Sequence, residues 1–369
     1  MNPIRILHIL HSMNRGGTEN ALMNYYRHID RTKIQFDFLL TAPSKSHFED
    51  EIEKMGGYVY RVPLLKMSNP FPYLKGVLQF LKRHPEYKIV HSHTCYKSFF
   101  PLFMAKIAGV NIRISHSHSS MTEGGYKGII RKLLMPFLKL VATDWFTCGE
   151  QAGKFLYGKN AVKTGKVKLF KNVIDAKLFN FSIENRESMR NSLGIEKDVF
   201  IVGHTARFDA VKNHKFDVDI LVELKKLYPK CKLLEVGLGV KEGLYDYATK
   251  KEVINDIIFV GVVNNVYDYE HAMDAFILPS FNEGLPLSIV EAQVSGLPCF
   301  TTKDRVSNEC SITDLVTFIP LESGPKVWAE SIIASIKVTR NNRLKDIVSA
   351  GYDAETSAKN LENYYLTRI

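Results

Sequence analysis

The feature that most constrains this chain is a repeated alternation of short apolar runs with longer segments of helical periodicity. Such runs are typical of strands buried on both faces, and helices between them allow consecutive strands to lie parallel. In the first half the runs lie at residues 4–10, 36–40, 58–62, 88–93 and 112–118. In the second half they lie at residues 199–207, 232–239, 256–263, 275–280 and 297–302. The pattern predicts two Rossmann-like α/β domains, each with a parallel sheet.

The length of the chain agrees with two domains. With 369 residues, 45% hydrophobic and 24% charged, it is a globular protein too long for one ordinary core. We place the first domain at residues 1–180 and the second at 181–343. The charged segment 344–369 is expected to form a helix that returns to the first domain, or else a plain surface helix. A central cleft between the domains, at the carboxyl ends of both sheets, would bind ligands.

Charge is divided unevenly between the two halves. Residues 1–180 contain 27 Lys+Arg against 12 Asp+Glu, a net charge of +15, whereas residues 181–369 contain 22 against 27, a net charge of −5. A basic domain suggests an anionic partner, either nucleic acid or a membrane surface. Because the charge lacks an aromatic-studded stripe or a known binding module, we expect no nucleic-acid partner.

Cysteines and hydropathy indicate the compartment. The five cysteines are scattered without a close pair, which argues against a disulfide framework or a zinc site. The first apolar run is short and interrupted by Arg5 and His8, unlike a signal peptide. No run of about 18 apolar residues occurs, so we expect no membrane-spanning helix. These features predict a cytoplasmic protein.

Segment 126–146 is the candidate for contact with a membrane surface. It combines Lys127, Arg131, Lys132 and Lys139 with leucine, isoleucine, phenylalanine and tryptophan. A stretch of this composition can lie at the headgroup boundary of a bilayer. The alternative is a helix that packs on the core with its basic residues outward.

Two glutamates eight residues apart mark the candidate ligand site, in 280-SFNEGLPLSIVEA-292. Glu283 follows a strand end, in a loop with Gly284 and Leu285. Pro286 can begin a helix, and the free N–H groups of Leu287 and Ser288, with the positive end of the helix behind them, attract phosphate or sugar oxygens. Glu283 should contact neutral hydroxyls, and Glu291 can accept from both hydroxyls of a ribose. The alternative is a capped helix with two solvated glutamates.

Arg207 and Lys212 lie in a loop after the strand at 199–207. Arginine can bind a diphosphate through two parallel hydrogen bonds, and lysine adds a mobile point charge. Together they could neutralise a leaving pyrophosphate without a metal ion. A basic surface loop is the alternative.

Histidines end two strands of the first domain, as the pairs His91/His93 and His116/His118. An imidazole there can donate a hydrogen bond to a substrate oxygen or act as a base near neutral pH. The H-x-H spacing is also that of a metal pair, but no third ligand has a matching spacing, so we expect no metal.

Three further motifs are weaker. Gly16-Gly17 after the first strand allows close approach of a ligand and a positive φ, or is a simple turn. Asp217 and Asp219 spell the D-x-D of metal-dependent sugar transferases, but they fall in a helix and are expected at the surface. Residues 237–239, Gly-Leu-Gly, lack the third glycine of a dinucleotide fingerprint, which disfavours a dehydrogenase.

These residues together resemble the retaining glycosyltransferases of family 4, which have the GT-B fold. The resemblance covers most of the chain and rests on GGTEN (16–20), ARFDAVKNH (206–214), LEVGLG (234–239), FVGVVNNV (259–266) and AFILPSFNEGLPLSIVEAQVSGLP (275–298). Its most specific part is the E-x7-E spacing. The bacterial capsule and exopolysaccharide branch is indicated by HSHTCYKSFF (91–100), RISHSHSS (113–120) and TCGEQAG (147–153).

The resemblance implies a role for each site residue. Glu283 would hold the hydroxyls of the donor sugar, Glu291 the ribose, and Arg207 with Lys212 the diphosphate. His118, with His116 as the alternative register, would lie beside the transferred sugar. The implied catalytic set is His118, Glu283, Arg207 and Lys212. The implied donor-binding set is Gly16, Gly17, Arg207, Lys212, Glu283, Gly284, Leu285, Leu287 and Glu291.

The function implied is that of a retaining, metal-independent hexosyltransferase without a cofactor. It would move a sugar from a nucleotide-sugar, by preference a UDP-sugar, to a lipid-linked or oligosaccharide acceptor in capsule or exopolysaccharide synthesis. A polyprenyl-pyrophosphate-linked acceptor implies peripheral association with the anionic inner face of the cell membrane. Two alternatives are a sugar-nucleotide epimerase of the same fold and a non-catalytic nucleotide-sugar-binding partner subunit.

Overall fold

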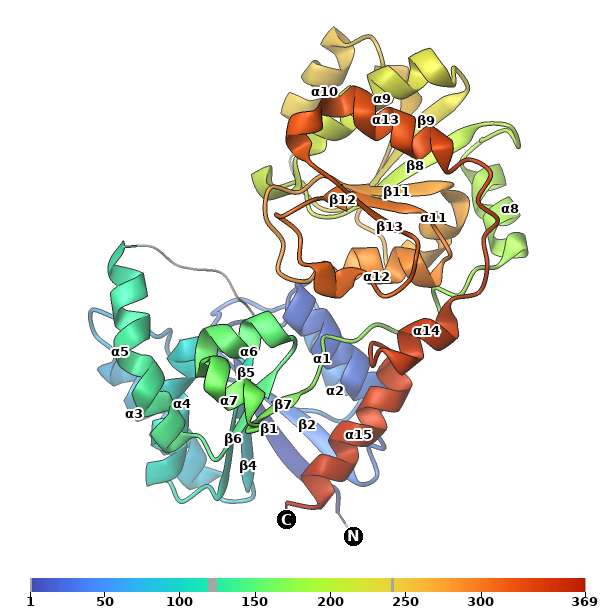
Figure 1. The fold of residues 1–369 in the computed structure, drawn as a ribbon. Helices are drawn as coiled ribbons and strands as arrows, with labels where there is room; N and C mark the ends of the chain where they lie inside the picture. The colour runs from blue at the N-terminus through green and yellow to red at the C-terminus, as the bar shows by residue number, and fades with distance from the viewer. Residues whose placement is uncertain (1, 119–124, 240–241, 369) are drawn as a thin grey trace. The chain divides into compact units, whose positions relative to one another are not determined.

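The computed structural model describes residues 2–118, 125–239 and 242–368, without the side chains of residues 125–127 and 242. The chain divides into two units, one made of residues 1–174 with 353–369 and the other of residues 175–352. Each unit has a parallel sheet between helices (Figure 1). The predicted class, α/β with two parallel-sheet domains, is confirmed.

The sheet of the first unit has the strand order β3-β2-β1-β4-β5-β6-β7. Its strands are β1 (Ile4–Leu10), β2 (Ile34–Leu40), β3 (Val59–Arg61), β4 (Ile89–Ser92), β5 (Ile112–Ser117), β6 (Asp144–Thr147) and β7 (Val167–Leu169). Its helices are α1 (Gly17–His28), α2 (Glu49–Lys54), α3 (Phe71–Arg83), α4 (Phe99–Ile107), α5 (Gly125–Val141), α6 (Glu150–Tyr157), α7 (Lys159–Lys163) and α15 (Ala354–Leu366).

Successive residues of β1 face opposite sides of this sheet, as a strand buried on both faces requires. Ile6 belongs to a core cluster with residues of α1, α2 and α15. Leu7 belongs to a second cluster with residues of α3, α4, α5 and α6. Figure 1 shows α1 and α15 on one side of the sheet and α3, α4 and α5 on the other.

The sheet of the second unit has the strand order β10-β9-β8-β11-β12-β13. Its strands are β8 (Phe200–Thr205), β9 (Cys231–Val236), β10 (Ile257–Gly261), β11 (Ala275–Leu278), β12 (Cys299–Thr302) and β13 (Val316–Ile319). Its helices are α8 (Ile183–Ser192), α9 (His214–Leu227), α10 (Glu242–Lys250), α11 (Val266–Ala272), α12 (Leu287–Val294), α13 (Gly324–Ala334) and α14 (Leu344–Ser349). Helices α9, α10 and α13 pack on one face, and α12 packs on the other.

The predicted domain boundaries at 180 and 343 differ from those of the structure. The first lies at 174, because Phe179 already belongs to the second unit, where its carbonyl accepts from the Ser295 hydroxyl at 2.9 Å. The second lies at 352, because α14 packs on α12. Only residues 353–369 join the first unit, where Asp353 caps α15 and bridges to Ile174.

Segment 126–146 forms a helix and the start of a strand, since α5 ends at Val141 and β6 begins at Asp144. Arg131 departs from both interpretations of this segment, because it faces neither a membrane surface nor solvent. Its side chain is buried, and its guanidinium lies 4.1 Å from the ring centre of Phe155. Within the described residues, no helix combines the length and apolar character that crossing a membrane requires.

Strand order determines where ligands can bind. In the second unit the order reverses between β8 and β11, which are neighbours although they are not consecutive in the chain. The loops that follow these two strands therefore adjoin at the carboxyl edge of the sheet, where ligands of such folds bind. In the first unit the same reversal falls between β1 and β4.

Candidate functional site

Lys212 and Glu283 meet where the loops after β8 and β11 adjoin. The Lys212 ammonium lies 2.6 Å from the Glu283 carboxylate, and the two side chains are only 18% and 16% exposed. The backbone also joins the loops, because the Phe281 N–H donates to the Val211 carbonyl at 2.8 Å. The structure thus brings together two residues that the sequence places 71 positions apart.

Arg207 lies at the other end of the first loop. Its side chain is 67% exposed, with the Asp209 carboxylate at 3.6 Å. Asn213 closes the loop in the left-handed conformation, with φ at 61°, and its side chain donates to the Pro279 carbonyl at 3.1 Å. The structure therefore anchors the loop at Asn213 and leaves the guanidinium of Arg207 accessible to an anion.

Helix α12 opens beside this ion pair. It begins at Leu287, after the loop with Gly284 and Leu285, and Pro286 precedes it in extended conformation. Among the described side chains, none caps this N-terminus with a hydrogen bond. The first N–H groups and the positive end of the helix dipole are therefore available to an oxygen ligand, as the sequence predicts.

Glu291 lies in the second turn of α12, half-buried, and burial raises its pKa to about 7. Glu270 on α11 is fully buried. Burial, and then the charge of Glu291, raise the pKa of Glu270 well above its usual range. The Thr205 hydroxyl, at the end of β8, donates to Glu270 at 3.4 Å. Glu270 is therefore a second buried acid that responds to the charge of Glu291, and the sequence predicted only Glu291 as a site residue.

Close packing of two loops explains why residues 237 and 239 are glycines. A Cβ at Gly237 would lie 1.7 Å from the Ala206 carbonyl oxygen, and one at Gly239 would lie 2.6 Å from the Phe208 side chain. These glycines let the loop after β9 pass close to the loop that carries Arg207.

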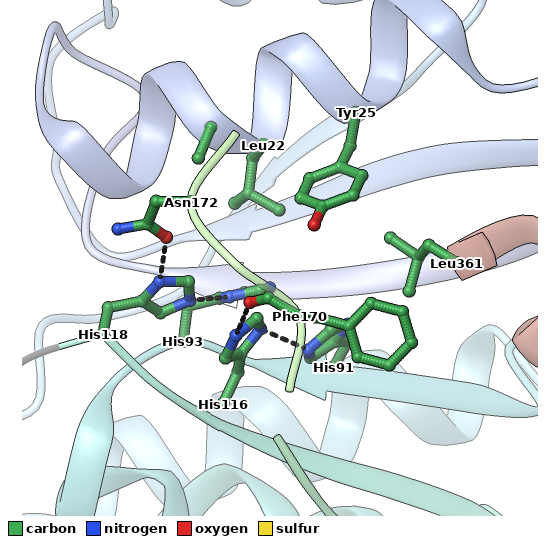
Figure 2. A pocket seen from close by; sticks show the side chains of 10 residues that line it. Leu22, Tyr25, His91, His93, His116, His118, Phe170, Asn172 and Leu361 are labelled. Atoms are coloured by element: carbon green, nitrogen blue, oxygen red, sulfur yellow. Dashed lines mark hydrogen bonds between the residues drawn. The ribbon is translucent and has the colours of Figure 1, made fainter. Parts of the chain in front are cut away.

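In the first unit, histidines on or next to the neighbouring strands β1, β4 and β5 form chains of hydrogen bonds, and Figure 2 shows His91, His93, His116 and His118. In the first chain of hydrogen bonds, the Tyr365 hydroxyl lies 2.7 Å from Nδ1 of His91. Nε2 of His91 lies 3.2 Å from Nδ1 of His116, and Nε2 of His116 lies 3.1 Å from the Phe170 carbonyl oxygen. Because a carbonyl only accepts, His116 is protonated on Nε2, His91 donates to it, and the Tyr365 hydroxyl donates to His91.

His118 belongs to the second chain of hydrogen bonds. Its Nδ1 lies 2.8 Å from the Asn172 side-chain oxygen, and its Nε2 lies 2.8 Å from His93, which lies 3.0 Å from His8. Burial lowers the pKa of His118 to about 4. A pKa this low disfavours a base near neutral pH and favours the hydrogen-bonding role that the sequence also allows. A neutral His118 could still donate one hydrogen bond to a substrate by exchanging a protein partner.

Gly16 and Gly17 differ from the sequence expectation in conformation. Gly16 is the extended residue before α1, with φ at −140°, and neither glycine has a positive φ. A Cβ at Gly17 would meet no heavy atom within 4 Å, so the space beside it is open. Their part in donor binding stays a prediction.

Three groups of described side chains place their ligand atoms within 4.8 Å of one another, as a metal site would. They are His8, His91 and His93; His93, His116 and His118; and His204, His214, Asp217 and Glu235. Sequence spacing gives no third ligand for either histidine pair, because His8 joins His91 and His93 from another strand, and His93 likewise joins His116 and His118. The last group was not anticipated at all.

Comparison with known proteins agrees with this geometry. Residues 185–351 match the family described as glycosyl transferases group 1. EpsF of Bacillus subtilis, which carries a glycosyltransferase name, is 34% identical over 98% of this chain and 96% of its own length. The chain therefore belongs to the group 1 glycosyltransferase family, and the resemblance drawn from the sequence is confirmed.

Other relatives are more specifically named. The capsular polysaccharide biosynthesis glycosyltransferase CapH of Staphylococcus aureus is 26% identical, with 99% of each chain covered. An Escherichia coli UDP-Gal:α-D-GlcNAc-diphosphoundecaprenol α-1,3-galactosyltransferase is 24% identical over 74% of this chain and 73% of its own. Anabaena HepE, solved with UDP-glucose, shares the fold with a TM-score of 0.78 at 19% identity, over 99% of this chain and 100% of that one. The GT-B fold is thereby confirmed.

Proposed function

We propose that the protein is a retaining, metal-independent hexosyltransferase that moves a sugar from a UDP-sugar to a polyprenyl-diphosphate-linked sugar, in capsule or exopolysaccharide synthesis. The observation that carries the proposal is the pairing of Lys212 with Glu283 beside the open N-terminus of α12. A cation, a carboxylate and free N–H groups at one sheet edge suit a diphosphate joined to a hydroxylated sugar.

Each group has a separate part in donor binding. Arg207, Lys212 and the N–H groups near Leu287 would hold the diphosphate. Glu291 would accept from the ribose hydroxyls, and Glu283 from the sugar hydroxyls once Lys212 turns to the phosphate. The names of the E. coli relative and of the HepE complex support UDP as the nucleotide.

In the proposed reaction the bond between the anomeric carbon and the β-phosphate oxygen breaks, and the acceptor oxygen bonds to that carbon on the same face. The acceptor proton passes to the leaving diphosphate. Negative charge that develops on the leaving oxygen would be stabilised by Arg207, Lys212 and the α12 N-terminus, so a metal ion is not required. His118, a neutral imidazole whose Nδ1–H donates to the Asn172 side-chain oxygen, would donate to the sugar in exchange for that bond.

We assign the acceptor to the first unit and to a membrane surface. Helix α5 exposes Ile129, Leu133, Phe137 and Leu140, by 63%, 62%, 53% and 71%, at intervals of four, four and three residues. This spacing forms one apolar stripe, and the exposed Lys132 lies beside it on a unit rich in positive charge. Such a helix would bring the enzyme to a lipid-linked acceptor at an anionic bilayer.

Vesicle sedimentation tests the membrane assignment. Leu133→Gln should weaken binding to vesicles of phosphatidylglycerol severalfold, whereas Leu227→Gln should not, because Leu227 is an exposed leucine on α9 of the second unit (47%). Equal binding by both variants, or no binding by the wild type at low salt, would refute the assignment.

The transferase activity is tested with a panel of UDP- and GDP-sugars and a synthetic polyprenyl-diphosphate sugar, in the presence of EDTA. The expected product is the acceptor extended by an α-linked hexose from one UDP-sugar, identified by mass spectrometry and the NMR coupling of its anomeric proton. Conversion of the donor without an acceptor would instead identify an epimerase. Donor binding without transfer until a second protein is added would identify a partner subunit.

A further inference from the structure

Four titratable side chains are buried together under the loop 206–213 of the second unit. His204 lies on β8 opposite Glu235 on β9, and the first turn of α9 adds His214 and Asp217. None of the four is more than 7% exposed. Buried charges need partners, so this group requires an explanation beyond donor binding by the loop residues themselves.

The D-x-D motif is part of this group, and its expected position at the surface is wrong for one member. Asp217 is fully buried on the inner side of α9, whereas Asp219 accepts a hydrogen bond from Tyr247 at 2.8 Å. The two aspartates therefore point in different directions, as the helical position predicts, but only one reaches solvent.

Hydrogen-bond partners determine the charge of His214. Its Nε2 lies 3.1 Å from the Arg207 carbonyl oxygen, which can only accept, so Nε2 carries a hydrogen. Its Nδ1 faces a carboxylate oxygen of Glu235 at 3.0 Å and of Asp217 at 3.4 Å. Burial lowers the pKa of His214, but the hydrogen bonds to Asp217 and Glu235 raise it to about 11. The ring therefore carries both hydrogens and a positive charge.

The ring is also fixed in orientation. The Phe208 and His204 rings stack on it, with centroid distances of 4.3 and 4.4 Å and interplanar angles of 17° and 23°. His204 is held in turn by Asp217 at 2.8 Å. A rigid cation thus connects the backbone at Arg207 to the sheet.

We propose that His214 is a positioning residue for the diphosphate of the donor. Its charged ring ties the Arg207 carbonyl to Glu235 on β9, and this tether fixes the loop that presents Arg207 and Lys212. The inference rests on the proposed function, since it assumes that these two side chains bind the diphosphate.

Two His214 variants distinguish the effect of losing the tether from the effect of a lower overall stability. In His214→Gln the side-chain amide can replace Nε2–H and still donate to the Arg207 carbonyl, whereas the shorter amide of His214→Asn replaces only Nδ1–H toward Glu235. Both lose the charged ring, so both should unfold at similarly lower temperatures. UDP binding, measured by calorimetry, should weaken about tenfold in His214→Asn, as for loss of one net hydrogen bond, and less than threefold in His214→Gln.

A third variant adds a pH readout that a merely structural role would not change. The groups that face His214 are Glu235 from β9, Asp217 from α9, His204 from β8 and the Arg207 carbonyl. Glu235→Gln removes one of the two carboxylates, so the pKa of His214 should fall. UDP affinity should then decrease as pH rises from about 7 to 8.5, whereas wild-type affinity should stay nearly constant over this range.

The possible results of these experiments bear separately on the positioning role of His214 and on the proposed function. If the wild type binds UDP and both His214 variants bind it equally well, the positioning role is wrong while the proposed function stands. If His214→Asn does not fold, the inference is refuted when the UDP affinity of Glu235→Gln does not change with pH. One equivalent of zinc in the purified protein would show that a metal, and not a proton, joins these four side chains. If the wild type binds no nucleotide, the proposed function fails and the inference fails with it.

Discussion

Replacement of Lys212 by methionine is the perturbation whose effects can be worked out most fully. The change keeps the aliphatic stem and removes the ammonium that lies 2.6 Å from Glu283. Breaking a buried ion pair costs about 3–5 kcal/mol, and an exposed pair contributes about 1 kcal/mol or less. With side chains 18% and 16% exposed, we expect a loss of about 2 kcal/mol in the free energy of unfolding.

Donor binding should respond separately. A hydrogen bond to a charged group contributes about 1.5–3 kcal/mol, so Lys212→Met should weaken UDP binding by about 10- to 150-fold. Glu283→Gln should leave UDP affinity nearly unchanged but weaken binding of the UDP-sugar, because Glu283 is assigned to the sugar hydroxyls. The double variant removes the unpaired carboxylate, so its stability should recover by about 1 kcal/mol or more while its UDP affinity stays low.

The assays are urea denaturation for stability and titration calorimetry for UDP and for the UDP-sugar. Two results would refute the reasoning. If Lys212→Met binds UDP as tightly as the wild type, Lys212 does not contact the diphosphate. If the double variant regains UDP affinity together with stability, the loss in Lys212→Met reflects a disturbed loop and not a missing ligand.

Three further predictions concern other parts of the two units. Burial raises the pKa of Glu291 from 4.5 to about 7, so the wild-type free energy of unfolding should fall as pH rises from about 4.5 to 7. Glu291→Gln should lack part of this fall. If the free energy of unfolding changes equally with pH in both proteins, the raised pKa of Glu291 is contradicted. Gly237→Ala should weaken UDP binding more than tenfold, because its Cβ would clash with the loop after β8, whereas Gly243→Ala, with open space around it, should bind normally. Tyr365→Phe should lower the free energy of unfolding by about 1–3 kcal/mol, because it leaves a buried His91 nitrogen without its donor; an unchanged midpoint in urea would argue against this hydrogen bond.

The long buried strands could be predicted from the sequence because a parallel sheet covered on both faces demands apolar runs. The expected run at 4–10 coincides with β1, and the helix expected to contain Asp217 and Asp219 is α9. Three of the shorter strands, β6, β7 and β13, gave no such signal. Among them, β6 was read as the end of a membrane-surface segment because Trp145 and Phe146 follow a basic helix.

Much of the candidate site was predictable because the strand that precedes each loop is recognisable. Carboxyl ends of neighbouring parallel strands meet at one edge, so Lys212 and Glu283 were expected to converge. Glu270 was missed because a glutamate near a helix end is usually solvated. Glu235 did give a signal, since a charge inside an apolar strand must be paired, but its partners are set by strand register and helix packing.

The central claim is that the second unit recognises the diphosphate of a nucleotide-sugar, and a comparison of uridine, UMP and UDP tests it most directly. We predict that affinity, measured by calorimetry in EDTA, rises in that order, with UDP at least tenfold tighter than UMP because Arg207, Lys212 and the α12 N-terminus bind the second phosphate. Equal affinities for UMP and UDP, or UDP binding that disappears in EDTA, would contradict the account.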